Sequence, residues 1–188
     1  MQQFLSAFIL SISSNLDTFA VSISYGMHKI KLPISSNLLI ALITTLGTFL
    51  SMLFGKLLTN IIPNSISNFI GGIALVLIGI WFLIESIRNK ESNNFLKADS
   101  NGSRVIELKE TIPLAFALTV NNLGVGISAS ITGISIFYST IFTFIITSIS
   151  IFAGSWLGHS FLGKLLGKYA PAASSILLII LGIYESFI

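Results

Sequence analysis

Cysteine is absent from this chain, and charged residues are scarce. Only 9% of its 188 residues are Asp, Glu, Lys or Arg, whereas soluble domains carry about 25%. Without cysteine the chain can form no internal disulfide, thiolate metal site or dithiol redox motif. The scarcity of charge, a hydrophobic fraction of 53% and a mean hydropathy of +0.92 together indicate an integral membrane protein.

Motifs of enzymes and of nucleic-acid-binding proteins are missing as well. The chain has no nucleophile–His–acid set, no phosphate-cradling loop and no redox-cofactor motif, so we expect neither an enzyme nor a bound cofactor. The sequence pI of about 9.3 does not require a nucleic-acid partner, because the basic residues follow the membrane topology described below.

Long apolar runs fill most of the chain. A membrane-spanning helix needs roughly 20 mostly apolar residues. Six segments meet or nearly meet this test: residues 4–27, 38–58, 66–87, 112–134, 141–161 and 172–188. The first segment lacks a basic leader and is too long for a signal peptide, so we expect a retained helix. The predicted fold class is an all-α integral membrane protein with six transmembrane helices, multi-pass in the cell membrane.

Basic residues lie almost entirely on alternate connections between these spans. Nine of the ten follow span one, three or five, and the other connections have only Lys56. The nine are Lys29, Lys31, Arg88, Lys90, Lys97, Arg104, Lys109, Lys164 and Lys168. Since basic loops stay in the cytoplasm, this pattern predicts that both termini face outside.

A polar connection at residues 89–110 divides the chain into two halves of three spans each, residues 1–88 and 111–188. "DTFAVSIS" at residues 17–24 aligns with "NNLGVGIS" at an offset of 104 residues. "ITTLGTFLSMLFG" in span two aligns with "ITSISIFAGSWLG" in span five at an offset of 103, and "IGIW" in span three aligns with "LGIY" in span six. Because three is an odd number, the second half enters the membrane from the opposite side, which predicts an inverted repeat.

One acid stands inside the apolar first span. Asp17 is the only Asp or Glu among the first 84 residues, and Asn121 is its counterpart in the second half. A charge at the bilayer centre costs about 2.5–3.5 kcal/mol on insertion scales, so such residues usually face a bundle interior or a wet cavity. We favour a functional ligand over the alternative, a protonated Asp17 that only joins two helices by hydrogen bonds.

Other oxygen-bearing residues accompany Asp17 on the same helix faces or at mid-span. The candidate metal ligands are Asp17, Asn121, Asn122, Asn15, Thr45 and Ser148. Further candidate binding residues are Ser14, Ser24, Ser128, Gly124 and, at the inner mouth, Glu85. Each hydroxyl could instead bond its own helix backbone, and each glycine could serve close helix packing. Oxygen ligands suit hard cations such as Mg²⁺, Mn²⁺ or Ca²⁺. Glu185 lies near a span end, and we expect it to be solvated.

The stretch "SNLDTFAVSISYG" resembles the Asp-Ala-Phe-Ala-Val-type motif of the MntP manganese efflux pumps. The three-plus-three organisation resembles that family and the wider LysE-like exporter superfamily, and the resemblance covers essentially the whole chain. It implies a mid-membrane aspartate in each half that is important for manganese export. Asp17 matches the first, whereas Asn121 occupies the second position within "LTVNNLGVGIS". This departure makes the chain most similar to the YtaF branch of sporulation membrane proteins.

Together these features predict a secondary transporter that exports a divalent cation such as Mn²⁺ through a midplane site between spans one and four. Asp17 would bind cation and proton alternately, and an ion gradient or the membrane potential would drive export. Two alternatives stay open: a non-transporting membrane protein that assists sporulation, and an exporter of a small organic solute. The expected partners are the lipid bilayer and a metal cation or proton, with homo-oligomers left open.

Overall fold

Six long helices make up almost all of the computed structural model, which describes residues 2–61, 63–88 and 98–187, the side chains of residues 2, 64, 65, 121 and 161–165 excepted. The helices are α1 (Gln2–Met27), α2 (Ile34–Leu58), α3 (Asn64–Arg88), α4 (Leu108–Ile131), α5 (Ile136–Leu157) and α6 (Phe161–Ser186). Five are long and apolar enough to cross a membrane, and α4 makes a sixth if its two bent parts count as one span. The protein is therefore an all-α, multi-pass membrane protein.

The helices follow the predicted spans, but each begins before its apolar run, and α6 does so by the widest margin. α4 begins at Leu108, α5 at Ile136 and α6 at Phe161, whereas the apolar runs suggested residues 112, 141 and 172. Polar and basic residues at these positions are acceptable in a helix although they are unfavourable in hydrocarbon. One consequence is that Ser174 and Ser175 lie in the middle of α6 rather than near its start.

The outward faces of the helices are apolar, and the inward faces carry many hydroxyl groups. On α2, Leu38, Leu42 and Leu46 are exposed at four-residue spacing, whereas Thr44 and Thr48 are buried on the opposite face. In a bilayer the exposed leucines would contact lipid tails. Small hydroxyl residues between helices allow close packing and interhelical hydrogen bonds.

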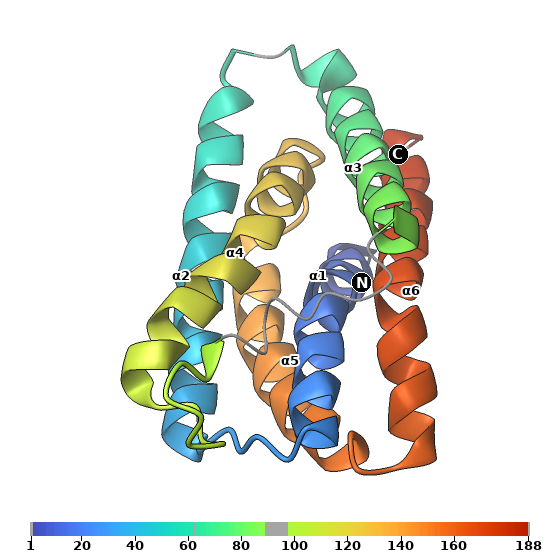
Figure 1. The fold of residues 1–188 in the computed structure, drawn as a ribbon. Helices are drawn as coiled ribbons and strands as arrows, with labels where there is room; N and C mark the ends of the chain where they lie inside the picture. The colour runs from blue at the N-terminus through green and yellow to red at the C-terminus, as the bar shows by residue number, and fades with distance from the viewer. Residues whose placement is uncertain (1, 62, 89–97, 188) are drawn as a thin grey trace.

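Each helix packs against particular partners, as the ribbon in Figure 1 shows. α1 lies against α5 and α6, and α4 lies against α2 and α3. α2 pairs with α5, and α3 pairs with α6, whereas α1 and α4 touch only lightly. Every one of these contacts has a counterpart when α1, α2 and α3 are exchanged with α4, α5 and α6.

Close glycine contacts follow the same exchange at single residues. Gly158, directly after α5, packs on the carbonyl oxygen of Ile23 in α1, and Gly55 of α2 packs on the carbonyl oxygen of Ile127 in α4. A Cβ added at either glycine would overlap that oxygen. Ile127 lies 104 residues after Ile23, and Gly158 lies 103 residues after Gly55. Both offsets are those of the sequence alignment.

The start of α1, the turn between α4 and α5, and the end of α6 meet at one end of the bundle, which we call the terminal end. The Gln3 side-chain amide donates to the carbonyl oxygen of Gly133 at 2.9 Å, and the Ser6 hydroxyl donates to the Glu185 carboxylate. Glu185 is only 6% exposed. Our expectation of a solvated Glu185 was therefore wrong, because the start of α1 packs over this residue.

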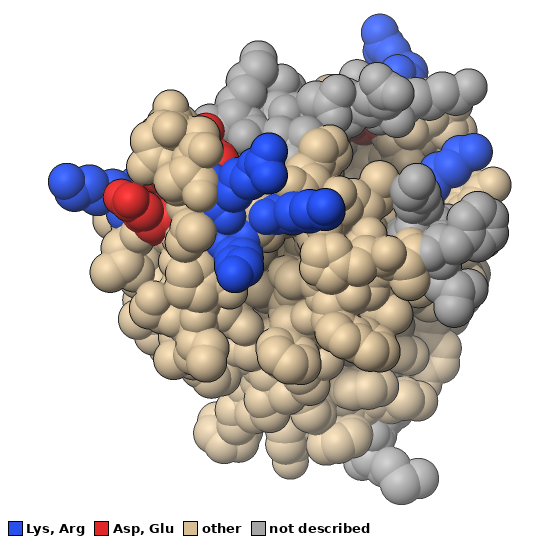
Figure 2. All heavy atoms as spheres, turned by 60° about the horizontal axis from the view of Figure 1, so that its bottom comes forward, with Lys and Arg blue, Asp and Glu red and all other residues tan. Residues whose placement is uncertain are grey.

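The loop between α1 and α2 lies at the opposite end, which we call the basic end. The Lys31 amide donates to the carbonyl oxygen of Arg104 at 2.8 Å, and the Ile106 amide donates to Lys31 at 3.0 Å. Residues 104–106 therefore pair with this loop before α4 begins. Figure 2 shows Lys and Arg side chains gathered on this face, which is the lower face of Figure 1.

Candidate functional site

Asp17 lies beyond the middle of α1 and is half-buried. Its Oδ1 accepts a hydrogen bond from the Thr18 backbone N–H at 2.6 Å, and the Thr18 hydroxyl lies 3.4 Å away. Thr18 itself is 1% exposed. The carboxylate is therefore held beside the buried side of α1, at a depth where a charge requires polar neighbours or a counter-ion.

Asn15 connects three helices through a chain of hydroxyl groups. Its side-chain NH₂ donates to the carbonyl oxygen of Ser11 at 2.8 Å, and its Oδ1 accepts the hydroxyl of Thr147 in α5. The Thr147 oxygen lies 3.5 Å from that of Thr44 in α2, and Thr44 also donates to the Ile40 carbonyl at 2.9 Å. Asn15 is fully buried, and its Oδ1 has a second lone pair beside the bond from Thr147.

Several polar atoms near the middle of the bundle are shielded from solvent and have no partner in the described residues. They include the hydroxyls of Thr45, Thr48 and Ser148 and the side-chain nitrogen of Asn122. Asn122 is 3% exposed, and rotating its amide by 180° would place an acceptor where the nitrogen lies. Buried polar atoms without partners are costly, so these oxygens are available to an ion or to water.

α4 bends by 41° between Leu108–Val120 and Asn122–Ile131. The bend falls at Asn121, the counterpart of Asp17. The side chain of Asn121 lies outside the described part of the structure, so its contacts stay a prediction. A bent or broken helix near the bilayer midplane frees backbone carbonyls and is common at transporter sites.

Two other candidate residues of α4 face α3 instead of α1. A Cβ at Gly124 would lie 3.3 Å from Cδ1 of Ile78, and the Ser128 carbonyl oxygen lies against Gly71. Ser128 is 4% exposed. The structure therefore places both residues in the packing between α4 and α3.

The remaining candidates make local contacts or are exposed. The half-buried Ser14 donates to the Ser11 carbonyl at 3.4 Å, and the Ser24 carbonyl faces the His28 ring nitrogen at 2.9 Å. Glu85 is exposed near the end of α3. Because α3 packs against α6 and α4, Glu85 is not brought together with Asp17.

Sequence reasoning missed Ser174 of α6. Its hydroxyl donates to the carbonyl oxygen of Ser13 at 2.5 Å, one helical turn before Asp17, and both serines are at most 6% exposed. The adjacent serines 174 and 175 inside an apolar run were the available signal. They were passed over because the predicted span began at residue 172 and placed them near its edge.

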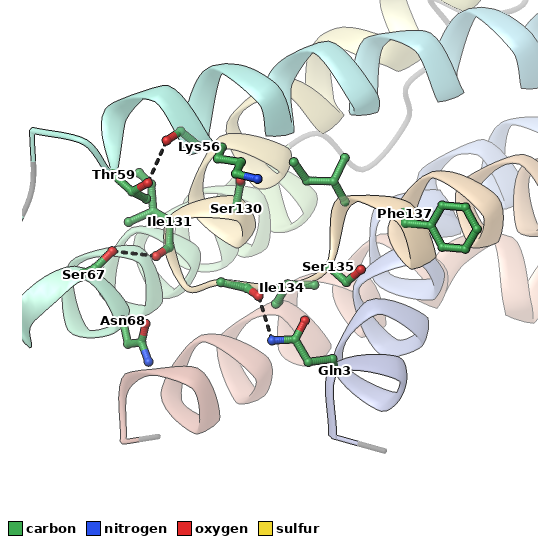
Figure 3. Close-up of a pocket in the computed structure, with 12 residues that line it drawn as sticks. Gln3, Lys56, Thr59, Ser67, Asn68, Ser130, Ile131, Ile134, Ser135 and Phe137 are labelled. Atoms are coloured by element: carbon green, nitrogen blue, oxygen red, sulfur yellow. Dashed lines mark hydrogen bonds between the residues drawn. The ribbon is translucent and has the colours of Figure 1, made fainter. Parts of the chain in front are cut away.

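A cavity of about 580 Å³ lies at the terminal end (Figure 3). Its lining comes from α1, α2, α3, α4, α5 and the turn between α4 and α5. The lining residues are Gln3, Lys56, Thr59, Ser67, Asn68, Ser130, Ile131, Gly133, Ile134, Ser135, Ile136 and Phe137. Ser67 donates across it to the Ile131 carbonyl at 2.8 Å. Lys56 is the only charged residue among the described residues of this lining.

The described residues contain no group of three or more His, Cys, Asp or Glu that could hold a metal ion. The candidate residues near mid-span are one carboxylate, Asp17, together with hydroxyls and amides. Such a set suits a hard cation in transit, since neutral oxygens hold it less tightly than several carboxylates do.

Known proteins similar to this chain are named as manganese efflux pumps and as a sporulation protein. A family model described as "Putative manganese efflux pump" matches residues 1–83 and 62–184. The "Probable sporulation protein YtaF" of Bacillus subtilis (strain 168) is 31% identical over 187 residues, covering 86% of this chain and 89% of the relative. The "Putative manganese efflux pump MntP" of Bacillus mycoides (strain KBAB4) is 24% identical over 192 residues, covering 100% and 98%. No solved structure matches significantly.

Proposed function

The chain belongs to the MntP family of membrane transporters, and we propose that it exports a divalent metal cation, with Mn²⁺ as the first candidate. The observation that carries this proposal is Asp17, a half-buried carboxylate deep in α1 with shielded, unpartnered hydroxyls elsewhere in the same bundle. Relatives named as manganese efflux pumps that align over nearly the whole chain support the substrate.

The proposed topology is an inverted repeat of residues 1–88 and 111–188 joined by residues 89–110. The exchange of packing partners between the halves supports it, as do the matched contacts of Gly55 and Gly158. With the basic end in the cytoplasm, the positive-inside rule puts both termini outside. The cavity at the terminal end then opens outward, and export ends there.

The proposed mechanism is alternating access at the contact between α1 and α4. These helices touch only lightly, so separating them breaks fewer contacts than separating any of the main helix pairs. Asp17 would hold the cation from the basic side and release it towards the terminal end, taking a proton in its place. The bend of α4 beside Asn121 would supply backbone oxygens to the ion.

Replacing Asp17 by Asn tests the proposal in vesicles loaded with Mn²⁺. We expect Mn²⁺ flux to fall at least about tenfold, because the only carboxylate within α1 would be lost. Asp99→Asn is the matched control. Asp99 lies in the segment before α4, where its Oδ2 accepts the Arg104 amide at 3.0 Å, and an Asn oxygen can accept the same bond. Equal flux in the two variants would contradict the proposal.

The exchange variant Asp17→Asn/Asn121→Asp sharpens the test. If the two positions face one ion, moving the carboxylate to the second half should restore at least part of the flux. No recovery, with the protein folded, would argue that Asn121 lies away from the ion.

A second candidate function is a non-transporting role in sporulation, which the YtaF relative supports. Asp17→Asn separates the two functions in a sporulating host that lacks its own copy. A scaffold should keep sporulation normal with this variant, whereas a transporter required for sporulation should not. Thermal stabilisation of the purified protein by Mn²⁺, but not by small organic solutes, would separate ion export from solute export.

A further inference from the structure

Glu185 is a buried carboxylate that the proposed cation path does not use. It lies on α6, one turn beyond Leu181, which belongs to an apolar core cluster with Ala7, Ile134 and Leu178. Its Oε1 accepts the Ser6 hydroxyl, and the side chain is 6% exposed. The carboxyl group therefore closes the terminal end of an apolar core.

Charged side chains are distant on the helices packed against α6. On α1, Asp17 lies eleven residues beyond Ser6, which is about 16 Å along a helix. On α3, Glu85 lies thirteen residues beyond Gly72, which faces residues 182–186, so it is about 20 Å away. Arg88 is farther still, and α5 contains no charged residue. Among the described residues of these helices, no cation lies at the level of Glu185, and an ionised carboxylate there would be unfavourable.

No residue of α6 is among the described lining of the outward cavity, which approaches this carboxyl group along α1 and α3. Gln3 lines the cavity one turn before Ser6, and Asn68 lines it one turn before Gly72. Figure 3 shows Gln3 and Asn68 on the same side of the cavity, near α6. Water in a cavity of about 580 Å³ would bring protons to within a turn of Glu185.

We propose that Glu185 binds a proton from the outward cavity, oriented by the Ser6 hydroxyl, and thereby couples proton entry to cation export. This inference rests on the proposed function. In the binding step the carboxylate takes a proton from hydronium in the cavity, leaving one water and a neutral carboxyl group. The position in the first half that corresponds to Glu185, 103 residues earlier, is occupied by Phe82. The proton site is therefore present in the second half only.

Vesicles with a pH dye inside and a Mn²⁺ gradient measure the protons moved per Mn²⁺ ion. In Glu185→Gln we expect this ratio to fall by about half, because Asp17 still takes its own proton, and in Ser6→Ala we expect a smaller fall. Tyr184→Phe is the matched control, because Tyr184 precedes Glu185 and is 45% exposed. An unchanged ratio in Glu185→Gln overturns the inference. No Mn²⁺ flux in the wild type, or equal flux in Asp17→Asn, overturns the proposed function instead.

Infrared difference spectroscopy tests Glu185 without transport. We expect a band of a protonated carboxyl group at neutral pH in the wild type and in Tyr184→Phe, and its loss in Glu185→Gln. Glu185→Asp should keep a shifted band, which guards against loss through misfolding. Identical spectra for the wild type and Glu185→Gln would contradict the inference while leaving cation export intact.

Discussion

The two halves of the chain pack alike but differ in their polar residues. Between α1 and α5, Gly154 of α5 packs on Ser22 of α1, and between α2 and α4, Gly126 of α4 packs on Ser51 of α2. Ser22 aligns with Gly126, and Ser51 aligns with Gly154. The same close contact is thus kept while serine and glycine exchange helices. The packing requires a glycine on one of the two helices at each crossing point, and either helix can supply it.

The polar chemistry does not follow this rule. Asn15 reaches across to Thr147, whereas its counterpart Thr119 donates to the Ala115 carbonyl of its own helix at 2.7 Å. Asp17 has an amide, Asn121, as its counterpart. At these two pairs of aligned positions, the first half therefore supplies the carboxylate and the interhelical bond. The two halves therefore keep the same packing while carrying different polar groups.

The largest effect should come from the matched glycines at the helix crossings. Gly158→Ala and Gly55→Ala each place a methyl group on a backbone carbonyl oxygen, which cannot move as a side-chain end can. Each should lower the free energy of unfolding by up to about 3 kcal/mol, measured by SDS titration in mixed micelles. Leu57→Ala, at a position that is 63% exposed, is the control. A loss in only one of the two glycine variants would break the comparison between the halves.

A smaller effect is expected where serine and glycine exchange helices. Gly126→Ser should cost about 1–2 kcal/mol, because the added Cβ meets the movable Ser51 hydroxyl. Adding Ser51→Gly recreates the arrangement of Gly154 and Ser22, so most of the loss should be recovered. The same titration measures both variants, and additive losses would contradict the proposed equivalence of the two crossings.

The smallest effect should distinguish the two threonines that meet between α2 and α5. Thr147→Val removes the donor to Asn15 and leaves a buried acceptor without a partner, at a cost of about 1–2 kcal/mol. Thr44→Val removes bonds to backbone carbonyls of its own helix, at a cost of about 0.5 kcal/mol. Equal losses in the free energy of unfolding would show that the bond to Asn15 is not the important difference.

Much of the fold could be read from the sequence. The predictions of a multi-pass membrane protein and of the MntP family are confirmed. The apolar runs located all six helices to within several residues at most ends. The start of α6 differed most, by 11 residues. Hydropathy reports the part of a helix that suits lipid, whereas a helix continues through Lys168 because its backbone bonds do not depend on the solvent around the side chain.

The sequence by itself determined the membrane class, the charge asymmetry of the two ends and the single carboxylate within the first span, because each depends on residue type and order along the chain. Only the tertiary structure decided which polar groups meet. It pairs Asn15 with Thr147, brings Ser174 beside Ser13 and buries Glu185 under Ser6. These pairs lie between 132 and 179 residues apart in the sequence. Their contacts follow from the crossing points of whole helices, which no local pattern specifies.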